Sequence, residues 1–308
     1  MARISGWALA SAVTDAGGLG FLGGGYGNRD WIDQQMHQVD PHRVGVGLIT
    51  WRLDETPEVL DHVLAWQPRA VWLSFGDPTP YVPRIKRAGA VAVCQVARLA
   101  EARAAVSAGA DILVVQGSEA GGHGRAGRGL MSLLPAVVDA VDPIPTIGAG
   151  GIASGRQLAA CWELGAAGVA VGTRLYATPE ASDVEQAKQR LVEMSGDDTV
   201  QTTVFDAVRG PSWPLGYTGR AAVNATTRAW HGNEAALDEV LTSERARYLA
   251  ADEANDVDRR VVWAGESVDL IDSIEPAGRV VRRLYDDARA SSRPAGPDLR
   301  TRPARAPS

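Results

Sequence analysis

A histidine within a run of glycines is the first residue whose type and setting suggest chemistry. His123 belongs to segment 116–125, Gln-Gly-Ser-Glu-Ala-Gly-Gly-His-Gly-Arg, which follows an apolar run. Imidazole takes or gives a proton near neutral pH, and the backbone at Gly121 and Gly122 lets a flat ligand approach. Gln116 carries an amide that can bond the edge of a heterocycle. The segment therefore predicts His123 as an acid–base residue. The other histidines are interpreted as surface or packing residues: His37, His42, His62 and His231.

Two further glycine clusters predict a phosphate site. Residues 148–152 read Gly-Ala-Gly-Gly-Ile before a helix that opens at Ser154, and residues 172–174 read Gly-Thr-Arg after the next apolar run. In β/α barrels the loops after the last two strands commonly bind phosphate. Glycine lets several backbone N–H groups converge on the charge, and Thr173 adds a hydroxyl donor. Two such clusters in consecutive loops favour phosphate binding over the alternative of plain tight turns.

Alternating elements must position these loops. Short apolar runs, of the kind expected for parallel strands buried on both faces, lie at 20–22, 44–49, 70–75, 90–96, 111–116, 145–147 and 168–172. Amphipathic segments that predict helices lie between them, at 30–39, 57–67, 80–88, 98–108, 130–141 and 154–164. The chain opens in a predicted helix at 7–16 with no strand before it. Seven strands leave two folds open: an open seven-stranded sheet, or a (β/α)₈ barrel that lacks its first strand.

The pattern changes after the seventh run. Helices are predicted at 179–194, 233–255 and 269–288, and the Gly/Pro-rich stretch 210–217 predicts an irregular loop. We therefore expect a barrel over residues 1–178, a helical and loop region packing on it over 179–290, and a disordered tail over 291–308. The acidic segment 233–256 is interpreted as a solvated face, and a homodimer interface is the alternative.

Composition excludes several classes of protein. The 308 residues carry a net charge of −6, which gives no indication of a nucleic-acid partner. No apolar stretch is long enough to span a membrane. The only cysteines, Cys94 and Cys161, are too few for a disulfide framework and are expected to be buried. No His/Cys cluster has the spacing of metal ligands. We therefore expect a cytoplasmic protein without a metal, a membrane partner or a nucleic-acid partner.

Several of these segments together resemble the nitronate monooxygenase family, formerly called 2-nitropropane dioxygenases, and the likeness extends over most of residues 1–285. The segments that carry it are Ala12–Gly20, Ser74–Pro78, Gln116–His123, Gly148–Gly151 and Gly172–Arg174. The resemblance implies an FMN-dependent (β/α)₈ barrel that oxidises alkyl nitronates, such as propionate 3-nitronate, or nitroalkanes with O₂. Detoxification is the role implied for such an enzyme.

The resemblance also implies roles for individual residues. His123 matches the active-site histidine, which would act as base toward a neutral nitroalkane or position a preformed nitronate. The remaining matches are cofactor-binding positions: Ala2, Gly23, Gln95, Gln116, Gly121, Gly122, Gly150, Gly151, Gly172 and Thr173. Glu266 departs from the family, which usually reads Ala-Gly-Gln at this point.

Two alternatives remain. The FMN-dependent enoyl-acyl-carrier-protein reductases share the Glu-Ala-Gly-Gly-His motif, although Gln116 and the segment 74–76 argue against that group. A non-catalytic barrel that binds FMN or another phospholigand is the other.

The resemblance also bears on the missing strand. Family members usually begin with a strand ending in Pro-Met-Ala, and Met1-Ala2 occupies that position here. We therefore expect a barrel that lacks its first strand, with a gap beside the flavin and two unpaired strand edges. A start further upstream would close it.

Overall fold

Seven parallel strands form one sheet in this computed structural model, which describes residues 1–291. In spatial order the strands are β1 (Phe21–Gly25), β2 (Gly45–Ile49), β3 (Ala70–Ser74), β4 (Val91–Val96), β5 (Ile112–Gln116), β7 (Thr146–Ala149) and β8 (Gly168–Ala170). Each strand pairs with its neighbour in the chain's order of parallel strands, as in a β/α barrel. All seven strands predicted from the apolar runs are confirmed.

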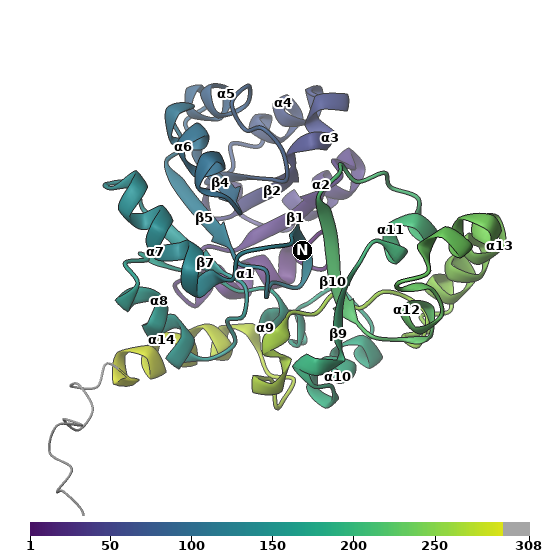
Figure 1. Cartoon of the computed structure of the whole chain (residues 1–308). Helices are drawn as coiled ribbons and strands as arrows, with labels where there is room; N and C mark the ends of the chain where they lie inside the picture. The colour runs from purple at the N-terminus through teal and green to yellow at the C-terminus, as the bar shows by residue number, and fades with distance from the viewer. Residues whose placement is uncertain (292–308) are drawn as a thin grey trace, which may run out of the picture.

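Helices connect the strands and cover the outside of the sheet (Figure 1). They are α1 (Trp7–Asp15), α2 (Arg29–Met36), α3 (Thr50–Glu55), α4 (Glu58–Ala65), α5 (Val82–Arg87), α6 (Leu99–Ser107), α7 (Leu130–Val141) and α8 (Gly155–Glu163). The sequence predicted all of these except α3. That helix is only six residues long and follows β2 without an intervening turn, so it has no periodic apolar face of its own to reveal it.

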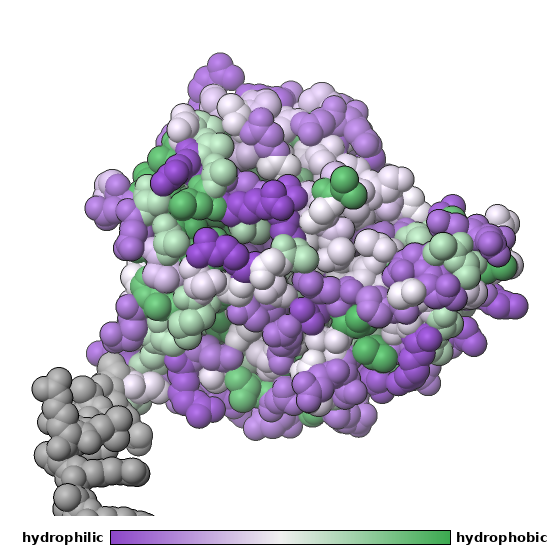
Figure 2. All heavy atoms as spheres, in the orientation of Figure 1, coloured by the Kyte–Doolittle hydropathy of each residue, from purple (hydrophilic) through white to green (hydrophobic). Residues whose placement is uncertain are grey.

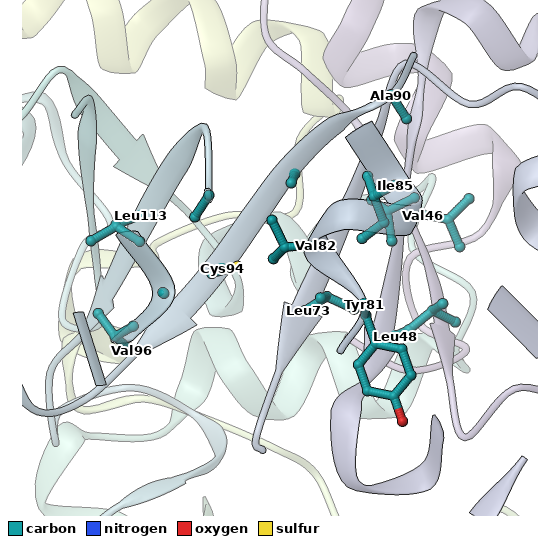
Figure 3. Packing of buried hydrophobic residues seen from close by; sticks show 14 of the residues in the cluster. Val46, Leu48, Leu73, Tyr81, Val82, Ile85, Ala90, Cys94, Val96 and Leu113 are labelled. Atoms are coloured by element: carbon teal, nitrogen blue, oxygen red, sulfur yellow. The ribbon is translucent and has the colours of Figure 1, made fainter. Parts of the chain in front are cut away.

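The apolar core lies between the sheet and these helices. Figure 3 shows side chains from several strands and from α5 converging on it, with Val46, Leu73 and Ile85 among them. Cys94 of β4 belongs to this core, and burial raises the pKa of its thiol to about 12. Cys161 of α8 is also buried. The expectation that both cysteines are packing residues is confirmed, because a neutral buried thiol is a poor nucleophile.

The barrel wall is open between β1 and β8, because each of them has only one strand partner in the seven-stranded sheet. The expectation of two unpaired edges is only half right. The backbone N–H of Arg3 donates to the carbonyl of Gly23, the N–H of Gly23 donates to the carbonyl of Ser5, and the Ser5 hydroxyl donates to the carbonyl of Phe21. The first five residues thus cover the edge of β1, and the amino terminus lies in front of that strand in Figure 1.

A second, antiparallel sheet was not predicted. It consists of β6 (Gly122–Arg125), β10 (Tyr217–Ala222) and β9 (Thr199–Thr202), in the spatial order β6-β10-β9. His123 therefore lies on a strand and not in the glycine-rich loop that the sequence predicted. The segment Gly-His-Gly-Arg has no alternation of apolar and polar residues, so only its pairing with the distant β10 makes it a strand.

The chain after β8 folds back onto the barrel. Its helices are α9 (Thr173–Tyr176), α10 (Glu185–Glu193), α11 (Val204–Arg209), α12 (Ala225–Trp230), α13 (Glu234–Glu253) and α14 (Ala277–Ser291). Of the predicted helices, 233–255 is confirmed as α13. The other two begin later than expected, α10 at Glu185 and α14 at Ala277, because residues 179–184 and 269–276 are turns, short 3₁₀ structure and coil.

Helix α14 packs against α8 and α1 and so closes the outside of the barrel near β8. Helix α13 lies at the opposite side of the view in Figure 1 and buries only four residues. Its outer side is mostly hydrophilic in Figure 2, with isolated exposed apolar residues such as Val240 and Leu249. No helix within residues 1–291 is long and apolar enough to cross a membrane. The tail predicted at 291–308 lies, apart from Ser291, outside the described residues.

Candidate active site

The backbone of His123 is fixed from two sides. Its strand β6 pairs with β10, where Gly219 lies directly opposite. The Gln116 side chain, at the carboxyl end of β5, donates from Nε2 to the carbonyl oxygen of His123 at 2.9 Å. A second amide orients the first one, because Nε2 of Gln95 donates to Oε1 of Gln116 at 3.0 Å. The structure thus brings together three residues that the sequence singled out, His123, Gln116 and Gln95.

The imidazole of His123 faces a carboxylate that the sequence did not reveal. Nε2 of His123 lies 2.8 Å from Oδ1 of Asp206, which belongs to α11. Both side chains are more than nine-tenths buried, with 8% and 9% of their surface exposed. The second oxygen of Asp206, Oδ2, is buried and has no hydrogen-bond partner within the described residues. A buried oxygen without a partner can accept a hydrogen bond from a ligand.

The environment keeps the imidazole neutral. Burial lowers the pKa of His123 from its usual 6.5, and the Arg209 charge lowers it as well, while the hydrogen bond and charge of Asp206 act in the opposite direction. Because a carboxylate only accepts hydrogen bonds, the bond to Asp206 requires the proton of the neutral ring to be on Nε2. Nδ1 then carries the free lone pair. An imidazole in this state has the chemistry that a general base needs near neutral pH.

Aromatic rings cover His123. The indole of Trp213 stacks on the imidazole with ring centroids 3.6 Å apart and an interplanar angle of 6°. The ring centroid of Trp263 lies 4.8 Å from that of the imidazole. Trp213 also meets the rings of Tyr26, Trp51, Phe75 and Tyr217. We call these five residues (Tyr26, Trp51, Phe75, Trp213 and Tyr217) the aromatic cap. They exclude water from the imidazole, which explains the direction of its pKa shift.

The cap draws on distant parts of the chain. Trp213 comes from the Gly/Pro-rich segment predicted as an irregular loop, which runs from α11 to β10 (Figure 1). Its indole N–H donates to the hydroxyl of Tyr26 at 3.1 Å. Phe75, at the end of β3, has a φ of +64°, a conformation that costs a bulky residue on the order of 1–3 kcal/mol. Strain of this kind gathers at functional sites, because the surrounding structure must hold the residue in place.

The glycines predicted to bind the cofactor divide into two groups. A Cβ atom on Gly122 would meet nothing within 4 Å, and one on Gly172 would meet only the sulfur of Met1 at 3.8 Å. These two backbones therefore face open space, as a cradle for a ligand requires. A Cβ on Gly121 would lie 2.5 Å from the Gly265 nitrogen, and one on Gly150 would lie 3.1 Å from the nitrogen of Ala120. Gly121 and Gly150 thus permit close packing between loops.

Gly151 is intermediate between the open and the closely packed glycines. Its φ is +67°, and a Cβ atom there would lie 3.3 Å from the side chain of Glu119. Thr173 begins α9, and its hydroxyl oxygen accepts the N–H of Gly265 at 3.0 Å. The hydroxyl proton of Thr173 is still available for a phosphate oxygen. An open backbone at Gly122 and Gly172, together with the unpaired Oδ2 of Asp206, fits a flat, phosphate-bearing group at this end of the sheet.

Ala2 and Gly23 also come together. A Cβ on Gly23 would lie 3.2 Å from Cα of Ala2. The two residues lie at the open side of the barrel, between β1 and β8, where Met1 approaches Gly172. Apart from Gly23, which lies in the middle of β1, the residues that the sequence proposed for the cofactor lie at or near the carboxyl ends of the strands or on the segment that covers the edge of β1.

A buried arginine anchors the loop that carries Thr173. The Arg174 side chain is fully buried and donates to Glu275 at 2.6 Å and to the carbonyls of Ala177 and Ser273. Glu275 also pairs with Arg283 of α14 at 2.6 Å. These contacts tie the end of β8 to the C-terminal helix, so α14 helps position the proposed phosphate loop.

A cavity of about 290 Å³ adjoins the glycine loop between α7 and α8, lined by Gly150, Gly151, Leu130, Cys161 and Glu266 among others. His123 and its ring contacts do not line it, so the cavity is not the place of proton transfer. Glu266, the departure from the family motif, pairs here with Arg220 at 2.8 Å. Its charge is therefore offset within the protein.

Comparisons with known proteins agree with this architecture. The family model described as nitronate monooxygenase matches residues 53–287. A nitronate monooxygenase of Neurospora crassa is 31% identical, and the match covers 94% of this chain and 87% of that protein. The structure of a nitroalkane oxidase from Streptomyces ansochromogenes superposes with a TM-score of 0.78 at 31% identity, covering 94% of both chains. FabK from Thermotoga maritima gives a TM-score of 0.79 at 28% identity, covering 94% of this chain and 91% of that one.

The fold and the site define a flavin-dependent oxidoreductase of the β/α-barrel class. Within that class the chain belongs to the nitronate monooxygenase family. The resemblance inferred from the motifs is thereby confirmed, and so is the barrel fold.

Proposed function

We propose that this member of the family oxidises alkyl nitronates, such as propionate 3-nitronate, or nitroalkanes with O₂, that its flavin is FMN, and that His123 is its base. The observation that carries the proposal is the buried pair of His123 and Asp206, with Nε2 and Oδ1 2.8 Å apart at the carboxyl end of the sheet. The open backbones at Gly122, which precedes His123 in the chain, and at Gly172 support a bound flavin.

The same residues support a position for the flavin. The phosphate would be held by the loops at Gly150–Gly151 and Gly172–Thr173, and the ring system would lie near Gln116 and Gly122. FMN bound there would supply the redox chemistry between the nitronate and O₂. The protein supplies orientation, a dry site and proton transfer.

Proton transfer begins at Nδ1 of His123. For a neutral nitroalkane, the bond between hydrogen and the carbon bearing the nitro group breaks. The proton goes to Nδ1, and the electron pair moves into the nitro group to give the nitronate. Asp206 then faces an imidazolium and stabilises its charge. For a preformed nitronate no proton needs to leave, and His123 serves to position and stabilise the anion.

Anaerobic mixing of the FMN-loaded protein with a nitronate tests this function, because the nitronate should reduce the flavin and NADH should not. Rapid reduction by NADH would favour the enoyl-acyl-carrier-protein reductase alternative, which shares the barrel and the Glu-Ala-Gly-Gly-His motif. Retained FMN without reduction by either compound would favour a non-catalytic flavin-binding barrel. His123→Ala is expected to abolish turnover of a neutral nitroalkane while FMN stays bound.

A further inference from the structure

Arg209 is a cation at the edge of the site, and it has no part in the proton transfer proposed above. It is the last residue of α11 and lies three residues after Asp206, so both side chains project from the same face of the helix. Its guanidinium carbon lies 5.7 Å from the ring centroid of Trp263. Trp263 in turn contacts the imidazole of His123. The short helix α11 therefore presents both a carboxylate, Asp206, and a guanidinium, Arg209, to the same site.

No carboxylate within residues 1–291 forms an ion pair with Arg209. Its guanidinium is hydrogen-bonded to the side chain of Tyr26, which carries no charge to offset it. Arg125, which also borders the aromatic cap, differs because Glu101 pairs with it at 2.8 Å. As a residue, Arg209 is only partly exposed. A partly buried cation without a counter-charge is unfavourable, so its place beside the base calls for an anionic ligand.

Two neighbours respond to this charge. Arg209 lowers the pKa of His123, and it opposes the rise that burial causes in the pKa of Tyr26. Its field therefore extends over the imidazole and over the aromatic cap. The cap offers few charges of its own, since it consists of aromatic side chains. An anion entering beside His123 would meet Arg209 as the nearby cation.

We propose that Arg209 binds the nitronate group of the substrate. This inference rests on the proposed function and deepens it, because it makes the anionic two-oxygen group the feature that the site recognises. A guanidinium is planar and offers parallel N–H donors, which match two oxygens on one atom. When His123 takes the carbon-bound proton, the electron pair from that bond moves into the nitro group. Arg209 then faces the charge that develops on the two oxygens, as Asp206 faces the charge on the imidazolium.

Arg209→Met tests the inference, because methionine removes the charge and keeps an apolar stem against Trp263. The KM for a preformed nitronate should rise about 10- to 100-fold, the range expected for a lost hydrogen bond to a charged group. Arg209→Lys should recover part of this loss. Arg228→Met is the matched control, since Arg228 is an exposed arginine on α12 and the change in net charge is identical. The control should leave the KM unchanged.

A binding measurement separates this inference from the proposed function. Sodium nitrite carries a planar two-oxygen anion and needs no turnover, so its binding to the FMN-loaded protein can be measured by titration calorimetry. We expect nitrite to bind the wild-type protein and to bind Arg209→Met at least about 10-fold more weakly. A wild-type protein that binds nitrite through Arg209 but never oxidises a nitronate would contradict the function and leave the inference standing.

The inference itself is overturned by either of two results. One is a KM for nitronate in Arg209→Met within twofold of the wild-type value, in protein with normal FMN content. The other is nitrite binding that is absent in the wild-type protein or equal in the two proteins. A rise of similar size in Arg228→Met would also overturn it, because it would show a general effect of net charge.

Discussion

His123 and Asp206 are separated by 83 residues of sequence and lie with Nε2 and Oδ1 2.8 Å apart, both shielded from water. Two separate parts of the fold produce this pair. His123 is held by β6 and by Gln116, and Asp206 is held by the short helix α11. The relationship makes Nε2 the donor to the carboxylate and leaves the free lone pair on Nδ1, which is the atom that we propose as the base.

Asp206→Asn tests the role of the carboxylate. An amide can donate to Nε2 and so favour the wrong tautomer, and it cannot stabilise an imidazolium. We expect kcat/KM for a neutral nitroalkane to fall about 100-fold or more, with a smaller effect on a preformed nitronate, which needs no proton removed. Steady-state kinetics with both substrates measures the split. Equal losses with both would mean that Asp206 has only a structural role.

The pH dependence follows from the state of His123. The imidazole is a base only when neutral, and its pKa is lowered from 6.5, so kcat/KM for a neutral nitroalkane should rise with pH through a midpoint below pH 6.5 and then level off. Trp213→Ala would admit water to the ring, which weakens the effect of burial and raises the pKa. The acid limb of the profile should then move to higher pH in this variant. An unchanged or lower midpoint would contradict the shielding role of Trp213.

Gly172→Ala tests the proposed phosphate cradle. The new methyl group would meet only the Met1 sulfur at 3.8 Å, so the protein itself tolerates it and any clash is with the ligand. We expect less bound FMN per protein, measured from the visible flavin absorbance after gel filtration, with unchanged thermal stability of the apoprotein. Gly168→Ala, within β8, is the control, because its methyl group would be 3.5 Å from the Ile147 side chain. Equal FMN content in both variants would place the phosphate elsewhere.

Arg174→Met tests the anchor between the end of β8 and α14. The substitution leaves Glu275 buried, although Glu275 keeps its second partner, Arg283. We expect the free energy of unfolding to fall by about 3 kcal/mol, at the lower end of the range for one lost partner of a buried ion pair. Urea denaturation of the apoprotein measures it. Arg279→Met, at an exposed site on α14, should change the free energy of unfolding little. A loss of stability as large as that of Arg174→Met would contradict the role of Arg174 as an anchor.

The sequence predicted the barrel well because its strands are continuous apolar runs. Strands such as β2 and β3 are buried on both faces, so nearly every residue in them is apolar and the signal is strong. The second sheet gave no such signal. The strand β6 is formed by Gly-His-Gly-Arg, which becomes a strand only through its pairing with β10.

The site was predicted in part for a similar reason. His123 stood out because glycines surround it and because its motif matches a family. Asp206 is one of 37 acidic residues and lies in a short helix without any motif, so nothing in the sequence separated it from the rest. Trp213 and Trp263 are two of nine tryptophans, and no motif marks either of them. Only the folded chain shows that both contact the imidazole.

Oxygen consumption with propionate 3-nitronate as substrate and FMN-loaded protein as catalyst tests the central claim most directly. The account predicts saturable O₂ uptake by the wild-type protein, raised KM in Arg209→Met, and loss of neutral nitroalkane turnover in His123→Ala with FMN still bound. O₂ uptake no faster than that of free FMN with the same nitronate, in protein that retains its flavin, would contradict it.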